Sequence, residues 1–184
     1  MAYYLILGVM FISVTCVNSQ EIEWERVSGG ISISYLQPNG DMGKYWNNSF
    51  GLGGELKYEL SKRTYLATGI QFSSFSKNNI KKSVPNFYFI SIPLEIKFIF
   101  LIANGLHLST GGGIQSNTFM FLGPEAEKLD DNDTESEFGI FIALGIETIS
   151  FNEHTLEFYS KYQTIFSSPE QIGILFIGMR FFFF

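Results

Sequence analysis

The feature that most constrains this chain is an alternation of large apolar residues with smaller or more polar ones. Ile140, Ile142 and Leu144, for example, are interleaved with Phe141 and Ala143. A period of two residues is typical of strands whose two faces meet different environments. The sequence therefore predicts an all-β chain of eight strands. The predicted strands are 27–37, 50–60, 64–75, 87–98, 106–121, 138–147, 155–166 and 171–184.

The connections between these strands alternate between long and short. The long connections are 38–49, 76–86 and 122–136, and the fourth in the same phase, 167–170, is short. The tight turns are 61–63, 102–105 and 151–154, and Asn104-Gly105 is a strong hairpin signal. An even strand number with short turns at one end and longer loops at the other is typical of outer-membrane barrels.

Side-chain volume indicates which face points outward. The interior of an eight-stranded barrel is just wide enough to be filled by side chains. The faces rich in Gly, Ala and Ser are therefore predicted to point inward, and the faces of large apolar residues to contact lipid. The predicted lipid-facing residues are Leu52, Leu56, Tyr58, Ile90, Ile92, Leu94, Ile140, Ile142, Leu144, Phe181 and Phe183.

Charged residues on the opposite faces are nearly balanced in sign. The proposed topology places almost all of them in the half nearest the short turns, with Lys161 near mid-height. Because buried charges must pair, this arrangement favours a closed interior that plugs the lumen. The predicted interior charge cluster is Glu55, Lys57, Glu59, Glu95, Lys97, Glu147, Glu157, Lys161 and Arg180.

The two ends of the chain carry further signals. Residues 3–17 form an apolar run that is too short for a membrane helix, and 1–19 are predicted to be a cleaved signal peptide that contains Cys16, the one cysteine. Residues 20–184 are then the barrel domain. At the other end, the terminal phenylalanines are predicted to join the aromatic girdle of a barrel, in a register that keeps Gly178 and Arg180 inside.

Three segments carry a family resemblance. They are Phe89–Phe98, with its Ile-Pro-Leu step, the glycine-rich Thr110–Gly113, and the aromatic terminus. With them the chain resembles the bacterial outer-membrane beta-barrel domain family, the small OmpA/OmpX-like and PorT-like barrels of the porin superfamily in Gram-negative bacteria. Pro93 lacks an N–H and is expected to cost a ladder hydrogen bond unless it sits at a bulge.

The resemblance implies an eight-stranded antiparallel up-and-down transmembrane β-barrel in the outer membrane, with no catalytic residues to carry over. It also implies contact with outer-membrane lipid and lipopolysaccharide. The C-terminal strand is expected to engage the barrel assembly machinery, although the terminal signal departs slightly from the family pattern.

The most acidic segment runs from 123 to 137. We interpret it as a solvated loop, because its calcium-loop-like stretch lacks the required glycine and the distal glutamate spacing. No cofactor or metal is expected, and a net charge of −6 argues against a nucleic-acid partner. The acidic residues are Glu125, Glu127, Asp130, Asp131, Asp133, Glu135 and Glu137.

The leading hypothesis is a non-enzymatic outer-membrane barrel with a structural role, or with an adhesion role through its external loops. A soluble periplasmic, lipocalin-like barrel that binds an apolar ligand is one alternative, and it requires the large apolar faces inside. A lipid A-modifying enzyme, based on the pair His107 and Ser109, is another. A conducting porin is a weaker one. The sequence does not name a loop partner.

Overall fold

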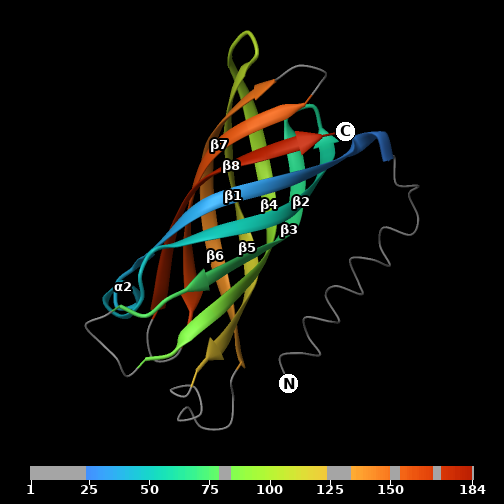
Figure 1. The fold of residues 1–184 in the computed structure, drawn as a ribbon. Helices are drawn as coiled ribbons and strands as arrows, with labels where there is room; N and C mark the ends of the chain where they lie inside the picture. Colours follow the sequence, from blue (N-terminus) through green and yellow to red (C-terminus); the bar gives the residue numbers. More distant parts are fainter. Residues whose placement is uncertain (1–23, 79–83, 124–133, 150–153, 168–170, 184) are drawn as a thin grey trace.

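Eight antiparallel strands close into a barrel in the computed structural model, which describes residues 24–78, 84–123, 134–149, 154–167 and 171–183 (Figure 1). Every strand pairs with its neighbours in the chain, and β1 pairs with β8 to close the sheet. The predicted fold class is confirmed. The strands are β1 (Val27–Asn39), β2 (Ser49–Ser61), β3 (Thr64–Phe75), β4 (Asn86–Ala103), β5 (Leu106–Leu122), β6 (Thr134–Ile149), β7 (Thr155–Phe166) and β8 (Gln171–Phe183).

The two ends of the barrel differ. The tight turns and the end of β8 lie at one end, called here the short-turn end, and the β4–β5 hairpin projects farthest there (Figure 1). The helix α2 (Met42–Tyr45) and the C-terminal ends of β1, β3, β5 and β7 lie at the other, the long-loop end. No helix among the described residues is long and apolar enough to cross a membrane.

The strand bounds differ from the sequence expectation in a few places. β3 and β7 agree, whereas β4 continues to Ala103 and β6 begins at Thr134. The β4–β5 turn is thereby reduced to Asn104-Gly105, where Gly105 has a φ of 73°, a conformation that favours glycine. Two helical turns, η1 (Trp24–Arg26) and α2, were not expected from the sequence. The predicted signal peptide lies outside the described residues.

Pro93 interrupts one ladder, as its missing N–H predicts. The β3–β4 pairing runs to Thr68↔Leu94 and resumes at Gln71↔Ser91 in the same register, so the gap is not a bulge. On its other side, Pro93 pairs with Gln115 of β5. The hydroxyl of Thr68 donates to the Pro93 carbonyl at 2.8 Å, which satisfies one backbone acceptor beside the gap.

Candidate functional site

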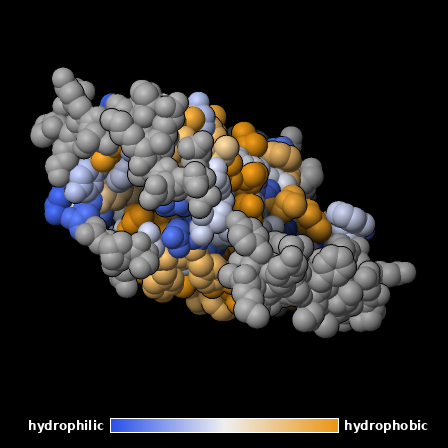
Figure 2. Space-filling view, turned by 90° about the horizontal axis from the view of Figure 1, so that it is seen from below, coloured by the Kyte–Doolittle hydropathy of each residue, from blue (hydrophilic) through white to orange (hydrophobic). Residues whose placement is uncertain are grey.

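The outer wall is a belt of large apolar side chains. Leu52 is 65% exposed, Leu94 45% and Ile142 67%, and the other predicted lipid-facing residues are also exposed or half-exposed. Figure 2, which looks onto the long-loop end, shows hydrophobic residues over much of the visible wall, with hydrophilic residues in smaller groups between them. The soluble, lipocalin-like alternative requires these large faces inside the barrel, and in that respect it is wrong.

Inside the short-turn half, oppositely charged side chains from several strands meet. Lys97 of β4 is central, because its Nζ lies 2.8 Å from an oxygen of Glu157 and 3.0 Å from one of Glu147. The same Glu147 oxygen lies 3.5 Å from the Nζ of Lys57. Glu157 also accepts a hydrogen bond of 2.5 Å from the Ser109 hydroxyl. All these side chains are buried, so their charges are compensated inside the protein rather than by water.

Arg180 adds β8 to the cluster and brings in two further carboxylates, those of Glu55 and Glu95. Its guanidinium lies 3.0 Å from Glu55, 3.3 Å from Glu157 and 3.5 Å from Glu95. The fork of donors on arginine suits several carboxylates at once. The register of β8 explains this placement, since Phe181 and Phe183 point outward while Arg180 is buried.

Phe182 faces inward, as the predicted register with Phe181 and Phe183 outward implies. It is buried inside the barrel, and the Nζ of Lys57 lies 4.2 Å from the centre of its ring. A terminal phenylalanine therefore helps to hold an interior cation.

Two members of the predicted cluster lie apart from it. Lys161 is buried but makes no ion pair within 4.0 Å among the described residues; its Nζ lies 4.0 Å from the Phe176 ring centre and 5.2 Å from that of Phe141. The expectation that every buried charge pairs with an opposite charge is wrong for Lys161, because the faces of the Phe176 and Phe141 rings contact its ammonium instead of a carboxylate. Glu59 is half-buried at the mouth of the short-turn end.

Interior glycines leave room for the charged side chains. A Cβ on Gly145 would lie 2.6 Å from an oxygen of Glu157, and one on Gly111 would collide with Glu95. A Cβ on Gly113 would meet the backbone carbonyl of Leu94, so β4 and β5 approach closely there. The small residues of the inward faces thus accommodate long charged side chains from neighbouring strands.

The long-loop half is filled by aromatic and aliphatic side chains, which the sequence analysis missed. The expectation of inward faces rich in small residues does not hold in this half, because here the lumen also has to be filled. The signal in the sequence was a loss of alternation, since Phe87-Tyr88-Phe89-Ile90 is apolar on both faces. This apolar core includes Leu36, Phe75, Phe87, Phe89, Phe119, Ile165, Ile174 and Phe176.

The β1–β2 connection caps the apolar core. Met42 of α2 is buried in it, and Trp46 packs edge-on against Phe87 with ring centres 5.3 Å apart. The indole N–H of Trp46 donates to the Pro85 carbonyl at 2.8 Å, and Asn47 donates to the carbonyl of Lys77 at 3.1 Å. The β1–β2 and β3–β4 connections are thereby tied together at the long-loop end.

Trp46→Phe is expected to lower the free energy of unfolding by about 1 kcal/mol, because it removes one hydrogen bond and keeps the ring contact. Urea unfolding of the refolded protein, followed by far-UV circular dichroism, measures the change. Trp24→Phe is the control, since Trp24 is 75% exposed. Equal stability of both variants would show that the indole N–H does not hold the cap.

The acidic segment falls largely outside the described residues, which leave out 124–133. Glu135 and Glu137 belong to β6 rather than to a loop, because the strand begins at Thr134. Both residues pair in register with β5. No cluster of possible metal ligands occurs within the described part of the chain.

His107 and Ser109 both face the barrel interior. Ser109 is buried and bonded to Glu157, and His107 lies beside a cavity at the short-turn mouth. Neither residue presents its side chain to the outer wall, where a lipid substrate would lie.

Comparison with solved structures finds the same barrel architecture in other proteins. Neisserial surface protein A superposes with a TM-score of 0.64 at 12% identity, over 84% of this chain and 95% of that one. The attachment invasion locus protein Ail of Yersinia pestis, in complex with the heparin analogue sucrose octasulfate, gives a TM-score of 0.52 at 12% identity, over 85% of this chain and 97% of that one. No protein-family model and no curated protein matches the sequence.

Proposed function

We propose that this protein, which has the fold of the small outer-membrane barrels, is a non-enzymatic integral outer-membrane barrel with a filled lumen. The observation that carries the proposal is the combination of an apolar outer wall with buried ion pairs inside a closed sheet. In water, such a wall would be an exposed apolar surface far larger than soluble monomers carry. In a bilayer the same wall is solvated by lipid, and the closed sheet satisfies the backbone.

The long-loop end is the surface we propose for structural or adhesive contacts. It corresponds to the extracellular end in barrels of this architecture, because their longer loops face outside. Glu135 and Glu137, at the start of β6, lie at this end, and the sequence that precedes them is also acidic. This charge disfavours polyanions, unlike the heparin analogue in the Ail complex, and favours a cationic partner or lipopolysaccharide bridged by divalent cations. We also propose that the C-terminal strand, with Phe181 and Phe183 outward, contacts the barrel assembly machinery.

Fractionation of cells that express the full chain tests the membrane assignment. We expect recovery in the outer-membrane fraction, and a folded band on a gel that shifts in mobility after boiling. Recovery in the soluble periplasmic fraction would contradict the proposal.

The filled lumen is expected to conduct poorly. Planar bilayers that contain the purified barrel should show no large, stable conductance steps, because the apolar core and the ion pairs occupy its two halves in series. The same preparation must show the heat-dependent gel shift, so that a silent bilayer is not due to unfolded protein. Reproducible steps of one size would argue for a pore and against a plugged interior.

A further inference from the structure

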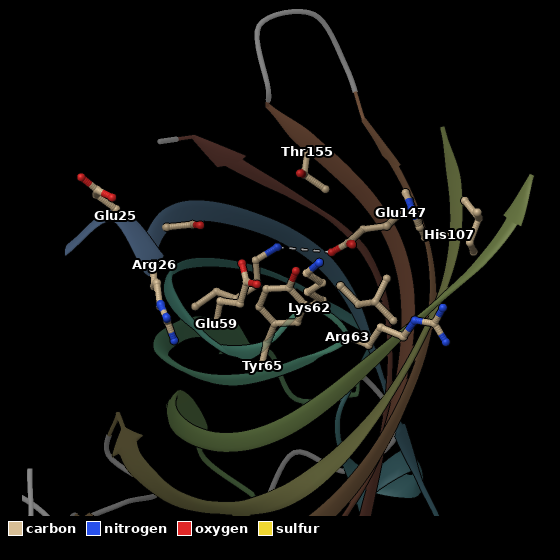
Figure 3. A pocket seen from close by; sticks show the side chains of 13 residues that line it. Glu25, Arg26, Glu59, Lys62, Arg63, Tyr65, His107, Glu147 and Thr155 are labelled. Carbon is tan, nitrogen blue, oxygen red and sulfur yellow. Dashed lines mark hydrogen bonds and ion pairs between the residues drawn. The ribbon is translucent and has the colours of Figure 1, made fainter. Parts of the chain in front are cut away.

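A cavity of about 490 Å³ opens at the short-turn mouth, on the far side of the ion pairs from the apolar core. Glu59 and Tyr65 point into it from β2 and β3, and Glu147 from β6 (Figure 3). The volume is in the range of small-molecule sites. Neither the fold nor the proposed function assigns a role to this cavity.

The floor of the cavity offers a cation with spare donors. Lys57 is 4% exposed, and its one recorded ion pair among the described residues is the 3.5 Å contact with Glu147. Glu147 uses the same oxygen for the closer Lys97, at 3.0 Å. The Lys57 ammonium has three N–H donors, and in the described part of the chain only one of them makes a contact, a long one, with a carboxylate oxygen. The ammonium also lies over the rings of Tyr65 and Phe182.

One wall of the cavity is apolar. Ile99 is buried and Leu101 is 64% exposed, and both line the cavity from the projecting β4–β5 hairpin. The backbone N–H of Ile99 donates to the carbonyl of Arg63 at 2.9 Å, which ties this hairpin to the β2–β3 turn. A ligand that fits here needs an apolar body beside this wall.

The rim limits how much negative charge a ligand can carry. Arg26, Lys62 and Arg63 line the rim, but Glu25 and Glu59 line it as well. A polyanion would meet these carboxylates, whereas a single carboxylate can reach Lys57 at the floor and leave the rim charges in water.

We propose that this cavity binds a small monoanion in which a carboxylate is attached to an apolar body, with the carboxylate at Lys57 and the body against Ile99 and Leu101. A peptide C-terminus and a short fatty acid share this chemistry. The proposal goes beyond the proposed function and needs only the folded barrel.

The test uses the full-length barrel in lipid nanodiscs with isotope-labelled isoleucine and leucine methyl groups. N-acetyl-leucine mimics a peptide C-terminus, and N-acetyl-leucinamide is its uncharged match. We expect the acid to shift the methyl signals of Ile99 and Leu101, and to bind about tenfold more tightly than the amide, because a charge-assisted hydrogen bond is lost in the amide. The same comparison of octanoate with octanamide tests a fatty acid as the ligand. Of N-acetyl-leucine and octanoate, the acid that binds more tightly indicates whether the natural ligand resembles a peptide C-terminus or a fatty acid.

Variants locate the site. Lys57→Met is expected to weaken binding of the acid about tenfold and to remove its preference over the amide. Leu101→Asn, at an exposed position that should not affect folding, is expected to weaken acid and amide alike. Lys44→Gln, at the opposite end of the barrel, should leave both affinities unchanged.

Three outcomes would overturn the proposal. They are unchanged methyl signals with both acids, equal affinity for acid and amide, and an unaltered affinity in a folded Lys57→Met barrel. If Lys57→Met does not fold, the affinities of the parent and of Leu101→Asn for the acid and for the amide still test the proposal. If neither acid binds but the protein is still a membrane barrel that shifts on a gel after boiling, only the ligand proposal is contradicted. The proposed function is tested by fractionation and does not depend on this result.

Discussion

Replacing Glu157 with leucine is expected to lower the free energy of unfolding by about 3–5 kcal/mol, because it leaves buried cations without their partner. Glu157 is 1% exposed and forms ion pairs with both Lys97 and Arg180. Arg180 keeps Glu55 and Glu95, and Lys97 keeps only Glu147, which it shares with Lys57. The loss is therefore expected to act mainly on Lys97.

Urea unfolding in lipid vesicles, read from tryptophan fluorescence and the gel shift, measures this loss. Glu59→Gln is the matched control, with an expected change within about 0.5 kcal/mol, because Glu59 is half-exposed at the mouth. Adding Lys97→Met to Glu157→Leu removes the stranded charge and should restore part of the stability. A single Glu157→Leu variant as stable as the parent would show that the ion pairs do not hold the interior together.

Ile142→Arg is expected to destabilise the barrel in a bilayer by about 2–4 kcal/mol, the cost of an arginine on the lipid face near the midplane. Ile142 lies in the middle of β6 and is 67% exposed, so the substitution breaks no interior contact. In a water-soluble barrel the same change would be close to neutral. The variant therefore tests directly whether lipid or water surrounds the outer wall of the barrel.

The control for Ile142→Arg is Phe183→Arg, near the end of β8, where the cost is expected to fall to about 0–1 kcal/mol. Both variants are compared with the parent by urea unfolding in vesicles of the same lipid. Equal and negligible effects at the two positions would contradict a membrane-embedded wall.

Much of the wall could be predicted from the sequence because period-two alternation is a local property of an extended chain. Leu52, Leu94 and Ile142 each carry the pattern of their own strand, and each is exposed as expected. The limits of β4 and β6 were less predictable, since pairing with β5 prolongs both strands beyond their alternating cores. The short helix α2 has too few residues to show a helical period.

The interior was harder to predict, because its contacts join residues that are distant in the chain. Lys57 and Glu147 are 90 residues apart, and Arg180 and Glu55 are 125 apart. Which charges meet depends on how the sheet closes and on the register of each strand. The period of two places Phe87 and Phe89 on the inward face with Glu95, but it did not show that aromatic rings from several strands meet there to fill the lumen.

The sequence by itself determined that this chain forms strands with one large apolar face, and side-chain volume indicated that this face points outward. The positions of the interior charges in the short-turn half also followed from the sequence. Only the tertiary structure decided which of these charges pair, that aromatic rings fill the long-loop half and that a cavity lies at the mouth. The physical reason is that alternation follows from the geometry of a single strand. Pairing across a closed barrel instead depends on the positions of all eight strands at once.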